Sequence, residues 1–206
     1  MFGDPSSSER PYPWESLGHY LRFVTSGSRG WAKYYSETGA RFIRSLDVRM
    51  NAVADEDAVY VKAPNNAEAR RTRVEVGDVL LTITGSRIGR VAAAPERLQD
   101  VYISQHVAIL RPDQTRLSPV FISYFLSTRE GGQRQIERAQ YGQTKPGLNL
   151  QQIRRFQVPM PPLILQREFE RCVAVVNCLK TRHTCSLIHL DALFASLQHR
   201  AFRGEF

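Results

Sequence analysis

The sequence predicts an α+β fold, in which a globular domain with mixed strands and short helices over residues 1–160 precedes a long C-terminal coiled-coil helix over residues 161–206. The first observation behind this is that short β-branched and aromatic runs are scattered among short helical segments without regular alternation, which disfavours a doubly wound sheet. The second is that residues 163–199 contain no proline or glycine and repeat apolar residues at alternating spacings of three and four. The proline-rich residues 156–162 lie between the two patterns and are expected to be a stiff, extended joint.

Within the first domain, the expected strands are four apolar segments rich in β-branched and aromatic residues, namely 41–44, 59–62, 77–85 and 101–110. His106 alternates with apolar neighbours in the last of these, so we expect a half-buried histidine with satisfied hydrogen bonds rather than a catalytic or metal-binding one.

The helical and irregular segments of this domain are indicated by their boundary residues. Ser118 and Pro119 mark the start of a helix, and the glycine pair 131–132 is expected to end it. Residues 133–138 are predicted as a second helix. Residues 65–73 are expected to form a polar break whose arginines lie on a solvated face.

The final segment is predicted to be one helix that pairs with another helix, for which a second copy of the chain is a candidate. From Leu165 to Arg200 it would extend about 54 Å at about 1.5 Å per residue, too long for the remaining domain to bury. The e positions are also apolar in part, which widens the stripe. With heptad position a set at residue 169, the a and d positions expected to form the dimer interface are Phe169, Cys172, Val176, Leu179, His183, Ser186, Leu190, Leu193 and Leu197.

Composition limits the class of protein and its partners. Hydrophobic residues make up 42% and charged residues 23% of the chain, which is ordinary for a soluble globular protein. The formal net charge of +8 indicates either an acidic partner, most commonly nucleic acid, or merely a basic solvated surface. Cys172, Cys178 and Cys185 have spacings that suit neither a zinc site nor a mutual disulfide, which favours a reduced setting. With no signal peptide or membrane-length apolar run, we expect a cytoplasmic protein without cofactor, metal or membrane contact.

One glycine-bounded segment, residues 28–35, combines basic and aromatic side chains. Arg29, Lys33, Tyr34 and Tyr35 are of the types that contact phosphates and stack on bases. The alternative is that Trp31 and one tyrosine anchor the segment in the core and leave the charges solvated.

A second glycine-bounded segment, residues 85–89, follows the clearest strand. It lacks the glycine spacing and the Lys-Ser/Thr pair of a nucleotide-binding phosphate loop. We therefore expect a tight turn with Arg87 and Arg90 at its tip.

Several motifs recur in a fixed order along the chain: Trp14 with Leu17 and Gly18, Gly77-Asp-Val-Leu-Leu-Thr-Ile-Thr-Gly85 with Gly89, Ser104-Gln-His-Val107, Leu110-Arg111-Pro112, Pro119 with Phe121 and Tyr124, Gly142-Gln-Thr, Leu148-Asn149, Val158-Pro-Met-Pro-Pro-Leu163 with Gln166, and Ala201-Phe-Arg-Gly-Glu205. This ordered set, which spans nearly the whole chain, resembles the DNA specificity subunit of type I restriction–modification systems. The resemblance implies one target-recognition domain followed by one helical conserved region.

The resemblance also implies partners. Such a subunit is not an enzyme; it reads a short DNA half-site and holds the methyltransferase (M) subunits that modify adenine, and restriction (R) subunits can join them. These subunits usually carry two recognition domains and two helical regions, whereas this chain has one of each. We therefore expect a half-length form that pairs with itself and reads a bipartite, palindromic site in double-stranded DNA.

The pairing would be antiparallel, with the middle of the helix at the twofold axis. His183 and Ser186, the two polar members of the stripe, lie there; they either fix the register of the pair or face solvent or another subunit. The helix pair would then set the distance between half-site centres at roughly one DNA turn, about 34–36 Å.

Within the resemblance, base reading is expected from two loops, residues 28–35 and 141–145. Gln143 is suited to adenine and Arg29 to guanine, while Lys33, Arg87 and Lys145 are suited to phosphates. The full set of residues expected at the DNA is Ser28, Arg29, Lys33, Tyr34, Tyr35, Ser86, Arg87, Tyr141, Gln143, Thr144 and Lys145.

Two other functions remain as alternatives. A DNA-acting enzyme is disfavoured because the chain has neither a methyltransferase Asn/Asp-Pro-Pro-aromatic motif nor the Glu-x-Lys pattern of common nucleases, and no residue is nominated as catalytic. An adaptor or decoy would bind modification subunits without reading DNA, and sequence preference in binding would distinguish it.

Overall fold

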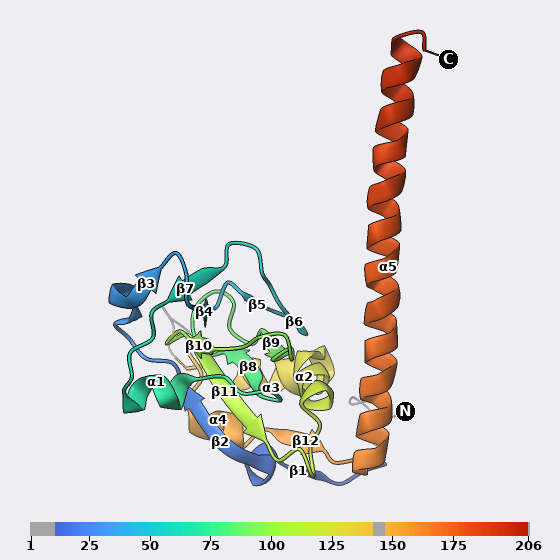
Figure 1. Cartoon of the computed structure of the whole chain (residues 1–206). Coiled ribbons are helices and arrows are strands. Elements are labelled where there is room, and N and C mark those ends of the chain that lie inside the picture. Colours follow the sequence, from blue (N-terminus) through green and yellow to red (C-terminus); the bar gives the residue numbers. More distant parts are fainter. Residues whose placement is uncertain (1–10, 142–146, 206) are drawn as a thin grey trace. The chain divides into compact units, whose positions relative to one another are not determined.

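The computed structural model describes residues 11–141 and 147–205 and divides the chain into two compact units, one ending at Arg167 and one starting at Glu168 (Figure 1). The first unit contains all the strands of the described residues together with short helices. The second is formed by most of one long helix. The expected α+β class, with a mixed domain followed by a long helix, is confirmed.

One four-stranded sheet of the first unit, here the antiparallel sheet, has every neighbouring pair of strands antiparallel. The central strand β11 is apolar on both faces, and its partner β8 is fully buried, as the run Val-Leu-Leu-Thr predicts. The strand order is β2 (Leu21–Ser26), β11 (Val107–Pro112), β8 (Val79–Thr82) and β9 (Val91–Ala93).

The second four-stranded sheet, here the mixed sheet, contains one parallel pair, β10 with β4. Two of the expected strands, 41–44 and 59–62, are confirmed in it as β4 and β7. The strand order is β10 (Val101–Ile103), β4 (Ala40–Ile43), β7 (Val59–Val61) and β3 (Tyr35–Ser36). Two short pairs complete the strands: β1 (Trp14–Ser16) with β12 (Gln157–Pro159), and β5 (Val48–Arg49) with β6 (Ala52–Val53).

The expected single strand over residues 101–110 is wrong. The chain leaves the mixed sheet after β10, makes a turn over residues 104–106, and enters the antiparallel sheet as β11. The backbone N–H of Val107 donates to the carbonyl of Ser104 at 3.0 Å and closes this turn. Consequently His106 lies on a turn and is exposed, rather than half-buried in a strand as expected.

The core lies on both faces of the mixed sheet because side chains alternate along its strands. Ile43, Val101 and Ile103 join residues of the antiparallel sheet in one buried cluster. On the other face, Phe42 and Tyr102 belong to a second cluster. The two sheets are therefore held together by apolar packing as well as by the shared chain.

The helix predicted from Ser118 and Pro119 is confirmed as α2 (Pro119–Ser127), and the Ser118 hydroxyl accepts the Phe121 N–H at 3.2 Å as an N-cap. The prediction that the glycine pair ends this helix is wrong. Both glycines lie in a π-helical turn, η3 (Arg129–Gln133), where a Cβ on Gly132 would be 2.2 Å from the Cα of Leu126. Glycine is needed there for close backbone approach rather than for helix termination.

The remaining short helices of the first unit cover the sheets. The segment 65–73, expected to be a polar break, contains the helix α1, capped by Asn66 and with Ala69 buried. The second expected helix, 133–138, is confirmed as α3. The bounds are η1 (Leu17–Tyr20), η2 (Trp31–Tyr34), α1 (Ala67–Thr72), α3 (Arg134–Ala139) and α4 (Leu150–Arg154).

A buried ion pair ties β8 to β11. Asp78 is fully buried and accepts from the Nε and Nη2 groups of Arg111 at 2.7 and 2.9 Å, and from the backbone N–H of Glu75 at 2.7 Å. Burial raises the pKa of the Asp78 carboxyl, while hydrogen bonding to that carboxyl raises the pKa of Arg111. Such a pair constrains the register of the two strands, because removing one partner leaves a buried charge.

The long helix α5 (Leu163–Phe202) begins in the first unit and is 40 residues, or about 60 Å at about 1.5 Å per residue. Its first turn is anchored by Gln166, which is fully buried, accepts the Ser118 N–H at 2.8 Å and donates to the carbonyl of Pro161 at 2.8 Å. The described residues include no helix long and apolar enough to cross a membrane.

The heptad residues of α5 all lie on this one continuous helix. In the single chain Phe169 is half-buried, and the apolar stripe after it remains exposed: Leu179 is 48% exposed, Leu190 61% and Leu193 56%. The polar positions His183 and Ser186 are exposed as well, as are all three cysteines. The stripe is thus open to a partner helix, and its role as a dimer interface stays a prediction.

Candidate functional site

Three connections of the first unit meet at one edge of the antiparallel sheet. Strands β2 and β8 both run antiparallel to β11, so the residues after β2 and β8 reach the same edge as the turn before β11. The Gly27 N–H donates to the Val107 carbonyl at 3.0 Å, and the Ile83 N–H donates to the His106 carbonyl at 2.9 Å. A Cβ on Gly27 would lie 2.2 Å from the carbonyl oxygen of Ser104, so glycine permits this close approach.

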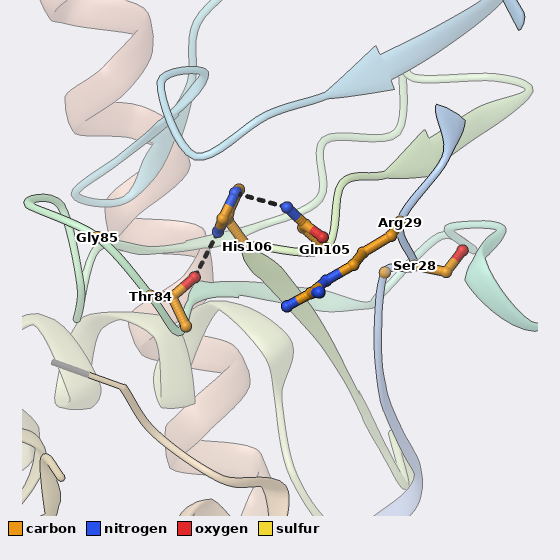
Figure 2. A pocket seen from close by; sticks show the side chains of 7 residues that line it. Ser28, Arg29, Thr84, Gly85, Gln105 and His106 are labelled. Atoms are coloured by element: carbon orange, nitrogen blue, oxygen red, sulfur yellow. Dashed lines mark hydrogen bonds between the residues drawn. The ribbon is translucent and has the colours of Figure 1, made fainter. Parts of the chain in front are cut away.

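This edge contains a pocket of about 540 Å³, which we call the edge pocket. Its side chains come from the loop after β2, the turn after β8 and the β10–β11 turn (Figure 2). They offer one guanidinium, one imidazole, one amide and two hydroxyls. The lining residues are Gly27, Ser28, Arg29, Thr84, Gly85, Gln105 and His106.

A chain of hydrogen bonds crosses the edge pocket. The Thr84 hydroxyl lies 2.5 Å from Nδ1 of His106, and Nε2 of His106 lies 3.1 Å from Nε2 of Gln105, as the dashed lines in Figure 2 show. Each nitrogen of the exposed imidazole therefore has one partner. The position of the Gln105 amide is thus coupled to residues of two different connections, which restrains a side chain that would otherwise be mobile.

The segment 28–35 is divided between the pocket and the core. Trp31 is only 5% exposed, stacks on Phe42 with ring centroids 5.1 Å apart, and donates its indole N–H to the Ser28 hydroxyl at 3.1 Å. Thus the expected alternative of a hydrophobic anchor holds for Trp31, which fixes Ser28 and places Arg29 at the pocket.

The other predicted residues of this segment are not among the lining residues. Tyr34 is half-buried with its ring edge-on to Trp31, and the Lys33 ammonium lies 5.0 Å from the Tyr34 ring centroid. Tyr35 is 51% exposed and begins β3. The segment therefore brings two of its five predicted residues, Ser28 and Arg29, to the pocket.

The turn after β8 has the tight form expected from its two glycines. The Ile88 N–H donates to the Gly85 carbonyl at 3.2 Å, and the Gly89 N–H donates to the Thr82 carbonyl at 2.9 Å. Ser86 is exposed at this turn, whereas Arg87 is half-buried and donates to the Leu46 carbonyl at 3.0 Å. Arg87 is consequently held against the β4–β5 loop and is not displayed at the tip as expected.

The second predicted loop is anchored beside the same pocket. The backbones of Tyr141 and Gly147 exchange hydrogen bonds at 3.0 and 2.9 Å, and Gly147 also forms an isolated bridge with Thr84. Tyr141 is 53% exposed at the base of this loop. The predicted residues Gln143, Thr144 and Lys145 lie outside the described residues.

The sequence prediction missed five lining residues, the glycines 27 and 85 and three that contribute side chains: Thr84, Gln105 and His106. A usable signal was the polar triplet 104–106, which interrupts an apolar run of strand type and marks a turn. What it cannot give is the partner, because Thr84 and His106 are brought together only by the pairing of β8 with β11. Among the described residues, no cluster of three or more His, Cys, Asp or Glu side chains is placed to hold a metal ion.

The family model of the type I restriction modification DNA specificity domain matches residues 43–169, which is more than half of the sequence. The chain belongs to this family. The resemblance found in the ordered motifs is therefore confirmed.

Relatives of the specificity family match the chain at low identity. The putative type I restriction enzyme MjaX specificity subunit of Methanocaldococcus jannaschii is 24% identical over 119 residues, covering 56% of this chain and 28% of the relative. A chain from a structure described as the basis of complex assembly and conformational transition of the type I R-M system has a TM-score of 0.65 and 21% identity, over 100% of this chain and 49% of that one. The HsdS subunit from Thermoanaerobacter tengcongensis has a TM-score of 0.58 and 20% identity, over 88% of this chain and 40% of that one. This chain thus spans about half or less of the length of each relative. The two structural matches show that the fold is shared.

Proposed function

We propose that this specificity-family chain is the DNA-recognition subunit of a type I restriction–modification complex, and that it supplies recognition rather than catalysis. One observation is the main support for the proposal. In a chain of the specificity family, the loop after β2, the turn after β8 and the β10–β11 turn together line one pocket, the edge pocket, which contains Arg29. The formal net charge of +8 supports it, because a basic protein is attracted to the phosphates of DNA.

The edge pocket suits contact with the major groove of a DNA half-site. Arg29 is exposed and carries the paired donors that match O6 and N7 of guanine. Tyr141 stands beside the pocket at the base of its loop, where an exposed ring can stack or pack on the DNA. Lys33 and Arg87 are proposed as phosphate contacts at the margins, and Gln143 and Lys145 keep their proposed roles toward adenine and phosphate.

The chain is proposed to form a homodimer through α5. An apolar stripe half-exposed along a helix of 40 residues is unfavourable in water unless another surface covers it. The second copy is proposed to lie antiparallel, as expected from the heptad pattern. The polar residue His183 falls at the middle of Leu163–Phe202, where the twofold axis of such a pair would pass.

A twofold dimer of this kind would read two half-sites in inverted orientation, separated by a fixed gap. Modification subunits would dock on the dimer, and restriction subunits could join them. The distance between half-site centres would be roughly 34–36 Å or a multiple of one DNA turn.

The test is selection from random DNA duplexes by the full chain together with a type I methyltransferase subunit. We expect enrichment of two short half-sites, inverted and separated by one gap length. If the methyltransferase subunit co-purifies with the chain but no sequence is enriched, the chain is an adaptor or decoy and the proposed recognition role is wrong.

A further inference from the structure

Gln105 is the under-satisfied polar group of the edge pocket. Its Oε1 atom is enclosed and has no hydrogen-bond partner within residues 11–141 and 147–205, while its Nε2 faces Nε2 of His106 at 3.1 Å. Exchanging the two ends of the amide would place the oxygen toward His106 and leave the NH2 group enclosed instead. In the orientation described, the Oε1 end of the amide lacks a partner, which is unfavourable until a complementary donor arrives.

The hydrogen bonds around His106 define which groups remain open. A neutral imidazole has one donor and one acceptor nitrogen. When Nε2 accepts from the Gln105 amide, Nδ1–H donates to the Thr84 hydroxyl, 2.5 Å away. Gln105 then retains one N–H donor, and its enclosed Oε1 acceptor can reach a ligand once the amide turns toward the pocket.

A planar amide that offers one donor and one acceptor is complementary to the major-groove edge of adenine. Adenine offers its N6 amino group as a donor and N7 as an acceptor, whereas guanine offers two acceptors there. Rotation about the last torsion of a glutamine side chain is soft, so the amide can turn toward the pocket with little strain. Arg29, which suits guanine, lines the same pocket (Figure 2).

We propose that Gln105 is a specificity-determining residue of the edge pocket and that it reads an adenine, with Thr84 and His106 as the residues that position its amide. This inference rests on the proposed DNA-recognition function and adds the base and the residue that reads it. It differs from the earlier expectation for residues 141–145, because the loop that carries it is the β10–β11 turn.

The experiment compares selected DNA sites for the wild-type chain and its variants in the presence of the methyltransferase subunit. Gln105→Ala should lower the preference for adenine at one position of each half-site by about 5- to 150-fold, as expected for one bidentate contact. Preference at the other positions should persist. Gln105→Glu removes the donor and keeps an acceptor, so the preferred base at that position should change from adenine toward cytosine.

Positioning by Thr84 is tested with a pair of variants. Thr84→Val keeps the shape but removes the hydroxyl, and should relax the same base position as Gln105→Ala. Thr84→Ser restores the hydroxyl and should restore the preference, which a role in packing alone would not predict. Gln151→Ala, an exposed glutamine on α4, is the matched control and should leave the selected site unchanged.

The outcomes separate this inference from the proposed function. If the wild-type chain enriches no site, the recognition function itself is wrong. If the wild-type chain enriches a site but the Gln105 variants keep the same profile, or lose affinity equally at every position, the base-reading role of Gln105 is overturned. If the wild-type site has a base other than adenine at the position that the Gln105 variants affect, the role is overturned as well.

Discussion

Replacing Leu190 with alanine should weaken the association of two copies through α5. Leu190 occupies an a position of the stripe and is 61% exposed in the single chain. Burying a whole leucine side chain contributes roughly 1.5–3 kcal/mol, so covering the exposed three-fifths contributes roughly 1–2 kcal/mol. A twofold dimer contains this residue twice, and the total of roughly 2–4 kcal/mol corresponds to a roughly 30- to 700-fold higher dissociation constant.

The matched control is Ile188→Ala. Ile188 is 60% exposed, nearly the same fraction as Leu190, but two residues along a helix point about 160° apart around its axis. Both substitutions introduce alanine, the best helix former, so neither should disrupt α5 itself. Only the position around the helix differs between them.

Sedimentation equilibrium of the full chain over a series of concentrations measures the dissociation constants. We expect the dimer of the Leu190 variant to dissociate at a much higher protein concentration than the wild-type dimer. The Ile188 variant should have the dissociation constant of the wild type. Equal weakening by both variants would show that the interface is not the heptad stripe. No dependence on either residue, or a wild-type chain that stays monomeric, would refute pairing through α5.

Two further predictions concern stability, measured by denaturant unfolding of the full chain. Arg111→Met should lower the free energy of unfolding by roughly 3–5 kcal/mol, because it leaves the buried Asp78 carboxylate without its charged partner. Arg49→Ala is the control: Arg49 forms an exposed pair with Glu56, and its loss should lower the free energy of unfolding by about 0–1 kcal/mol. Burial raises the pKa of Asp78 and Arg111 lowers it, so the pKa of Asp78 should be higher in the Arg111 variant than in the wild type. The stability deficit is fully present above the variant's pKa and should shrink as the pH falls through it; a pH-independent deficit would contradict this account. Gln166→Ala should cost roughly 1–3 kcal/mol by leaving buried backbone groups without partners, and an unchanged stability would show that this anchor is unimportant.

How far the sequence predicts the candidate site depends on whether a residue acts within its own segment. Ser28 and Arg29 follow from a local pattern of glycines, a hydroxyl and a basic residue, and they do line the edge pocket. Lys33 and Tyr34 belong to the same local pattern, but Trp31 packs on Phe42 in the core, Tyr34 packs beside it, and neither Lys33 nor Tyr34 lines the pocket. Local composition does not distinguish the two halves, because burial of an aromatic depends on the sheet that it meets.

Local sequence signals were sufficient to predict the α+β class, the start of α2, the strands β4, β7 and β8, and the long helix, because a cap, an alternation of side chains or a heptad repeat lies within one segment. Contacts between distant segments were needed to divide residues 101–110 between two sheets and to bring Thr84, Gln105 and His106 into one pocket. The physical reason is that a turn between sheets and a hydrogen bond between strands are set by which β-strands pair, and that pairing joins residues far apart in the chain.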